Sequence, residues 1–193
     1  MGADGSFSEE LLRERYSSDL ANGLGNLWHR FASMVEKYYN GQVPEGEPDW
    51  TTPVLAKALA LEPSVSKLMR EYNPKDSLVQ IFEVITMANQ FVEERKPWSL
   101  SRLASDPTAQ PADVKLAQIN LAETMIILAE VLLRTGFLLL PFLPKTAPKI
   151  LTRLKSSPTI SGLSLTKRVV APLSLIEKGD PLFPRLEDEP LKA

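Results

Sequence analysis

Residues 125–142, MIILAEVLLRTGFLLLPF, form the most apolar stretch of the chain and decide which kind of fold it can adopt. The stretch carries two charged residues, Glu130 and Arg134, and it ends at Pro141. A helix that spans a membrane rarely accepts two charges in its middle. The stretch therefore predicts a helix buried in a protein core.

Outward from this core helix, apolar residues recur at spacings of mostly three and four, the period of amphipathic helices. The first such stripe covers about eight turns and consists of Leu11, Leu12, Tyr16, Leu20, Leu24, Leu27, Phe31, Met34, Val35 and Tyr38. Ser6 and Glu9 form a capping-box pattern before this stripe, and Asn40-Gly41 provides a left-handed stop after it. A second stripe, from Leu78 to Val92, predicts a helix that begins at Asp76 or Ser77 and ends before Pro97.

Prolines and capping residues indicate the remaining boundaries. Residues 42–52 hold three acids and two prolines and predict a loop, and so do the polar residues 99–111. Thr52-Pro53 has the pattern of an N-cap followed by proline at the first helical position. Further helices are expected over 53–72, with a break at Glu62-Pro63, over 112 to about 140, and over 145–154. The pattern predicts an all-α bundle of about five helices.

The composition changes after residue 155. Serines, glycines and prolines interrupt short β-branched runs such as Arg168-Val169-Val170. We interpret residues 156–193 as an extended C-terminal tail that follows the helical domain of residues 8–155 and packs on another surface, and not as a second domain.

The net charge, the absence of cysteine and the single histidine argue against several classes of function. The formal net charge is −2, so any nucleic-acid binding must be local, because a general nucleic-acid coat would be strongly basic. The chain has no cysteine and one histidine, His29, so we expect neither a metal site nor a catalytic group in it. The small, acidic N-terminus is neither a signal nor a transit peptide. The absence of cysteine fits a reducing compartment, and we expect the cytoplasm, although an organellar location stays open.

One candidate binding residue is Trp98, which follows Pro97 directly after the predicted helix end, next to Arg95 and Lys96. A large aromatic ring at such a place could stack on an unpaired nucleobase. It could equally cover a hydrophobic crevice, which is the common role of tryptophan and the one that this segment favours by itself.

Asn26 and Arg30 form a second candidate, because a spacing of four places them on one face of the first helix. Asparagine offers a donor and an acceptor to a base edge, and arginine offers a planar fork. Spacing alone favours an ordinary surface pair, so both interpretations remain.

Together these segments resemble a known family. The motifs that carry the resemblance are Asp19-Leu20-Ala21-Asn22-Gly23-Leu24-Gly25-Asn26-Leu27-x-x-Arg30, Ala88-Asn89-x-Phe91-Val92-x-x-x-x-Pro97-Trp98, the segment from Phe137 to Ile150, and the closing Gly179-Asp180-Pro181-Leu182-Phe183-Pro184-Arg185-Leu186-Glu187. In this order they are similar to the C-terminal anticodon-binding domain of methionyl-tRNA synthetases, over about residues 4–188. Residues 1–7 resemble the linker that follows the catalytic domain of that family.

The resemblance implies a helical bundle that recognises the CAU anticodon of methionine tRNA. The family's anticodon-reading residues fall on Asn26 and Arg30, and its stacking tryptophan and the preceding proline fall on Trp98 and Pro97. The expected partners are the anticodon loop of methionine tRNA and the catalytic domain of the same protein, with no DNA and no membrane.

The chain departs from the family in lacking both signatures of the catalytic domain, His-Ile-Gly-His and Lys-Met-Ser-Lys-Ser. By itself it is therefore not expected to be an enzyme or to need a cofactor. ATP and methionine would bind the missing catalytic domain of a parent methionine–tRNA ligase. The alternative is a stand-alone, non-catalytic paralogue that acts as a tRNA-binding or protein-interaction module.

Overall fold

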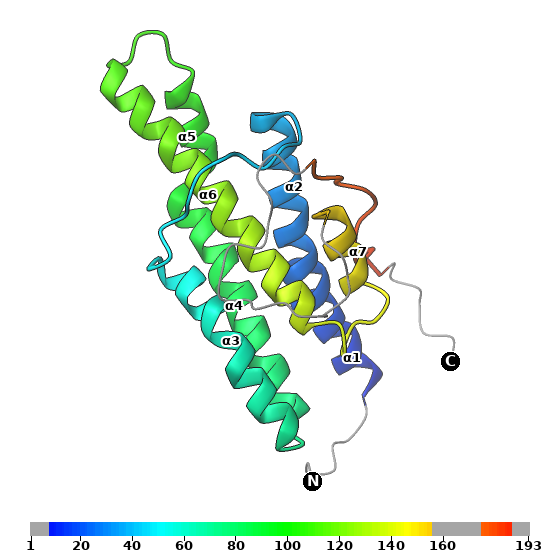
Figure 1. The fold of residues 1–193 in the computed structure, drawn as a ribbon. Helices are drawn as coiled ribbons and strands as arrows, with labels where there is room; N and C mark the ends of the chain where they lie inside the picture. The colour runs from blue at the N-terminus through cyan, green and yellow to red at the C-terminus, as the bar shows by residue number, and fades with distance from the viewer. Residues whose placement is uncertain (1–7, 156–174, 187–193) are drawn as a thin grey trace.

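The computed structural model describes residues 8–155 and 175–186, and its helices form one bundle (Figure 1). In chain order the elements are α1 (Glu9–Arg15), the π-helix η1 (Tyr16–Gly25), α2 (Asn26–Tyr39), α3 (Pro53–Arg70), α4 (Pro74–Arg95), α5 (Pro97–Ala104), α6 (Pro111–Leu138) and α7 (Ala147–Arg153). The only β-type pairing in these residues is an isolated bridge between Gln42 and Leu175. The prediction of an all-α fold is confirmed.

The first three elements form one continuous rod, as the long apolar stripe predicts. Ser8 caps its start, because its side-chain oxygen accepts a hydrogen bond from the Leu11 N–H at 3.3 Å. The predicted capping residue Ser6 lies outside the described residues. At the other end Asn40 takes the predicted left-handed conformation, with φ 51°, and ends α2.

The predicted break at Glu62-Pro63 is wrong, because α3 continues through Pro63. Pro63 lies on the exposed side of the helix, while Leu61 and Val65 on either side of it are buried in the core. Proline removes one backbone hydrogen bond, and the packing of α3 against α4 is sufficient to keep the helix continuous.

The predicted loop over residues 99–111 is wrong for its first part, because Pro97–Ala104 forms α5, whereas residues 105–110 do form a loop before α6. Pro97 occupies the first helical position, which needs no N–H donor. The short helix packs against α6, and Leu100 reaches the core. Similarly, α4 starts at Pro74 instead of Asp76 or Ser77, because Asn73 caps it by accepting from the Asp76 N–H at 3.2 Å.

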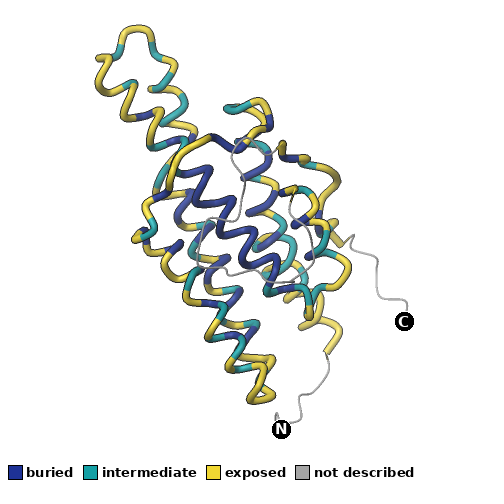
Figure 2. Tube along the Cα trace, viewed as in Figure 1, coloured by how far each residue is buried: buried dark blue, intermediate teal, exposed yellow. Residues whose placement is uncertain are grey.

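Helix α6 lies at the centre of the bundle, and all its residues from Thr124 to Phe137 are buried (Figure 2). By length and composition alone this helix could cross a membrane, but most of its apolar stretch is buried inside the fold. Its two charges, Glu130 and Arg134, have fully buried side chains and form an ion pair at 3.2 Å. Burial lowers the pKa of Arg134, and the Glu130 carboxylate opposes that shift. The prediction of a buried core helix is confirmed.

The described part of the tail, residues 175–186, runs back along the first rod. The Ile176 N–H donates to the Gly41 carbonyl at 2.7 Å, the Trp28 indole donates to the Lys178 carbonyl at 3.1 Å, and the Tyr16 hydroxyl donates to the Pro184 carbonyl at 2.8 Å. These contacts attach the tail along the rod from its C-terminal end towards its start. The remainder of the predicted tail and the predicted linker of residues 1–7 lie outside the described residues.

Replacement of Arg134 by methionine should destabilise the fold strongly, because it removes the buried ion pair between Arg134 and Glu130. We expect the free energy of unfolding to fall by about 3–5 kcal/mol in urea denaturation. Lys57→Met is the matched control, since it removes an exposed ion pair with Glu83 and should cost no more than about 1 kcal/mol. Equal stability of the two variants would contradict the assigned role of the buried pair.

Candidate nucleic-acid interface

The four predicted site residues lie on two helices that meet at the end of α4. Asn26 and Arg30 occupy the first turns of α2, and Pro97 and Trp98 begin α5. Lys96 connects α4 to α5 in a left-handed conformation, with φ 45°, so that the chain turns sharply between the two helices. As a result Pro97 is buried, while 40% of Trp98 remains exposed.

Arg30 lies between Trp98 and an acidic residue of α4. Its guanidinium carbon is 5.9 Å from the centroid of the Trp98 ring, a distance at which a cation and a ring attract each other. One of its terminal nitrogens is 2.8 Å from a carboxylate oxygen of Glu93. The Glu93 carboxylate therefore holds the Arg30 guanidinium beside the Trp98 ring, and a ligand with hydrogen-bond acceptors could take the place of that carboxylate.

Asn26 belongs to a chain of amide hydrogen bonds that determines its orientation. The Asn89 Nδ2 donates to the carbonyls of Gly23 and Ile85, both at 3.2 Å. Because carbonyls only accept, the Asn89 Oδ1 must face Asn26, whose Nδ2 donates to it at 3.3 Å. The Oδ1 acceptor of Asn26 is thus the atom turned away from Asn89.

These side chains line a shallow cleft of about 340 Å³ between the first rod and α4. Its lining residues are polar or small, and they are Ser18, Asn22, Gly23, Asn26, Arg30, Thr86, Asn89, Gln90 and Glu93. The cleft therefore offers hydrogen-bonding groups along its walls, with the exposed Trp98 ring next to Arg30.

Asn89 and Glu93 contact the predicted site residues directly, but sequence reasoning did not assign them to the site. One signal was available, since they are four residues apart on α4, the same spacing that singled out Asn26 and Arg30 on α2. Their partners lie more than sixty residues away in the sequence, so spacing within one helix did not identify these contacts.

Groups that could hold a metal ion, and the single histidine, were also located in the described residues. Within residues 8–155 and 175–186, no three His, Cys, Asp or Glu side chains come close enough together to hold a metal ion. His29 is exposed on α2, on the turn between Asn26 and Arg30.

The chain was compared with known proteins. No protein-family model matches the chain. The chain is 34% identical over 194 residues to methionine–tRNA ligase 1 of Bacillus anthracis, an alignment that covers 96% of this chain and 27% of the relative. It is 31% identical over 202 residues to the methionine–tRNA ligase of Streptomyces coelicolor, covering 98% of this chain and 35% of the relative.

Solved structures give the same result. The crystal structure of the free Mycobacterium tuberculosis methionyl-tRNA synthetase superimposes with a TM-score of 0.84 and 30% identity, over 97% of this chain and 37% of that one. The same enzyme bound to methionyl-adenylate superimposes with a TM-score of 0.81. The chain thus spans 27–37% of the length of these proteins. It is homologous, over nearly its whole length, to one part of the methionyl-tRNA synthetases.

Proposed function

We propose that this chain recognises the CAU anticodon of methionine tRNA as part of a methionine–tRNA ligase whose catalytic domain lies outside it. The observation that carries the proposal is that Asn26 and Arg30 line one cleft and Trp98 lies against Arg30, within a chain homologous to methionyl-tRNA synthetases. Activation of methionine with ATP would take place in the other part of such a protein, in the cytoplasm.

In this proposal Trp98 is the stacking platform for one unpaired base. The indole is rigid and partly exposed, and it is fixed at the start of α5 by the buried Pro97. Stacking on such a ring is worth ~1–3 kcal/mol per base and tolerates any base, because every base has a flat face. Stacking therefore supplies affinity, and selectivity must come from the neighbouring polar groups.

Asn26 and Arg30 have the chemistry to read the edge of that base. The Oδ1 of Asn26 is an acceptor, whereas the guanidinium of Arg30 presents only donors. Together they match a base edge that places a donor beside acceptors, as the Watson–Crick edge of cytosine does. Uracil presents an acceptor where cytosine presents its amine, so it would face the Asn26 oxygen unfavourably.

The ion pair with Glu93 limits how readily Arg30 can bind a base. In the free protein its carboxylate is paired with the guanidinium at 2.8 Å, and a base must share or replace that contact. The net charge of −2 provides little long-range attraction for RNA. We therefore expect the isolated chain to bind a stem-loop modestly, and best at low salt.

Trp98→Ala should weaken binding of a CAU anticodon stem-loop by about 5- to 150-fold, the equivalent of one lost base–aromatic stack. The measurement is a titration of labelled stem-loop at fixed low salt. Tyr72→Ala is the matched control, because Tyr72 is 91% exposed at the turn between α3 and α4 and should not contact RNA. Equal affinities of the Trp98→Ala and unchanged chains would contradict the proposal.

Arg30→Lys should lower the preference for a CAU over a UAU stem-loop, even though the charge is kept. Lysine replaces a planar fork of donors by a point charge and cannot hold the same edge geometry. Both affinities are to be measured in parallel, with Arg13→Lys on α1 as the control. If the preference survives in Arg30→Lys, Arg30 contacts only the phosphate backbone.

A further inference from the structure

We propose that Glu123 of α6 is a positioning residue for Trp98, acting through its ion pair with Arg95, the last residue of α4. The inference rests on the proposed RNA recognition. It explains how the Trp98 indole stays in position when a bound base replaces Glu93 as the partner of Arg30.

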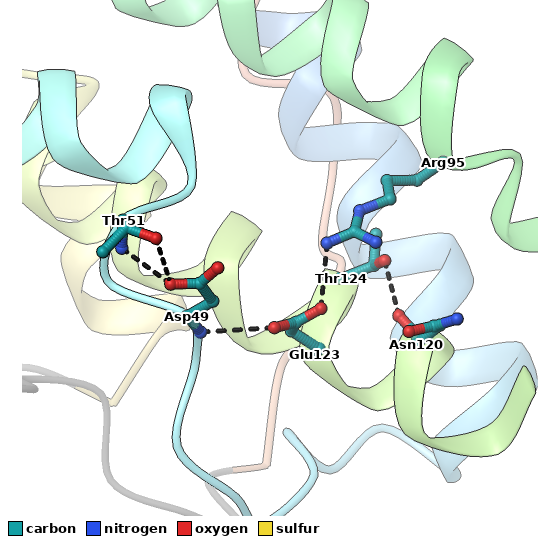
Figure 3. Close-up of polar contacts among 6 residues, drawn as sticks. All are labelled: Asp49, Thr51, Arg95, Asn120, Glu123 and Thr124. Carbon is teal, nitrogen blue, oxygen red and sulfur yellow. Dashed lines mark hydrogen bonds and ion pairs between the residues drawn. The ribbon is translucent and has the colours of Figure 1, made fainter. Parts of the chain in front are cut away.

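Glu123 is held by two partners on opposite sides (Figure 3). One of its carboxylate oxygens accepts from the Arg95 guanidinium at 2.9 Å, and the other accepts from the Asp49 N–H at 3.2 Å. Asp49 belongs to the loop that joins α2 to α3, and its own carboxylate accepts from both the N–H and the hydroxyl of Thr51. The side chain of Glu123 is 21% exposed, so the pair is more shielded than an ordinary surface ion pair.

Arg95 is restrained as well. Its side chain is 31% exposed, and its guanidinium carbon lies 5.2 Å from the centroid of the Phe91 ring on the preceding turn. The cation is thus fixed between a ring of its own helix and a carboxylate of α6. This attaches the last turn of α4 to the core helix.

The last turn of α4 therefore carries two ion pairs of opposite polarity. Glu93 pairs with Arg30 of α2, and Arg95 pairs with Glu123 of α6. A base that binds Arg30 competes with the first pair and leaves the second intact, because neither Arg95 nor Glu123 lines the cleft. The end of α4 then depends on its contact with α6.

The position of α4 is transmitted to Trp98 over a short path. Lys96 follows Arg95, and its carbonyl accepts hydrogen bonds from the N–H groups of Ser99 and Leu100 at 2.8 and 3.2 Å. The first turn of α5, which contains Trp98, is therefore bonded directly to the residue after Arg95. A shift at the end of α4 would move the indole relative to the cleft.

The test compares Glu123→Gln with Glu83→Gln in the full chain. Both changes remove one negative charge from an ion pair with a neighbouring helix, but Lys57–Glu83 joins α3 to α4 away from Trp98. The affinity of each variant for a CAU stem-loop is measured at fixed low salt, once in the chain that retains Trp98 and once in the chain that also carries Trp98→Ala. We expect Glu123→Gln to weaken binding by about 3- to 10-fold, and Glu83→Gln to have no such effect. In the Trp98→Ala background Glu123→Gln should cause no further loss.

The same loss in both backgrounds would overturn the positioning role, because Glu123 would then act on the fold in general. Absence of any loss with Trp98 present would overturn it too. If Trp98→Ala alone leaves RNA affinity unchanged, it is the proposed function that fails. That result is distinguishable, because the Trp98→Ala variant is measured by itself.

A measurement without RNA tests the positioning directly. With 5-fluorotryptophan in the protein, the three indoles of Trp28, Trp50 and Trp98 give separate fluorine resonances, and Trp98→Phe identifies the relevant one. Glu123→Gln should shift or broaden the Trp98 resonance and leave that of the buried Trp28 in place. An unchanged Trp98 resonance would overturn the proposal whatever the RNA affinities are.

Discussion

Burial of residues 124–137 of α6 on all sides constrains the arrangement of the other helices. A helical segment with no exposed face must be surrounded, and α2, α3, α4, α5 and α7 each pack against some part of α6. Glu130 and Arg134, the two charges of that segment, are one turn apart and pair with each other, and Arg134 also lies 6.0 Å from the centroid of the Trp50 ring. This arrangement makes α6 a common reference for the elements that carry the candidate site.

The candidate site follows from that packing. Once α2 and α4 lie against α6, their polar faces meet beside it, and Asn26 and Arg30 contact Asn89 and Glu93. The sharp turn at Lys96 then places Trp98 next to Arg30. The chain that forms this cleft corresponds to 27–37% of the length of the methionyl-tRNA synthetases to which it is homologous.

Local patterns could predict much of the fold because each depends on neighbouring residues. The apolar stripe before Asn40 predicted the first rod, and the apolar run over residues 125–142 predicted the core helix. Predictions failed where a tertiary contact outweighs a local preference. Packing of Leu61 and Val65 carries α3 through Pro63, and packing against α6 keeps Pro97–Ala104 helical in a segment whose polar residues predicted a loop.

Helical periodicity relates residues three and four apart, so it was enough to predict the all-α class and to place Asn26 and Arg30 on one helix face. The sequence also singled out Trp98 as an aromatic ring after a helix end. The groups that these residues contact depend on how the helices pack together. Asn89 orients the amide of Asn26, Glu93 and Trp98 share Arg30, and Arg95 reaches Glu123. These partners are separated by 28 to more than 60 residues in the chain, and periodicity within one helix does not reveal which faces of different helices meet.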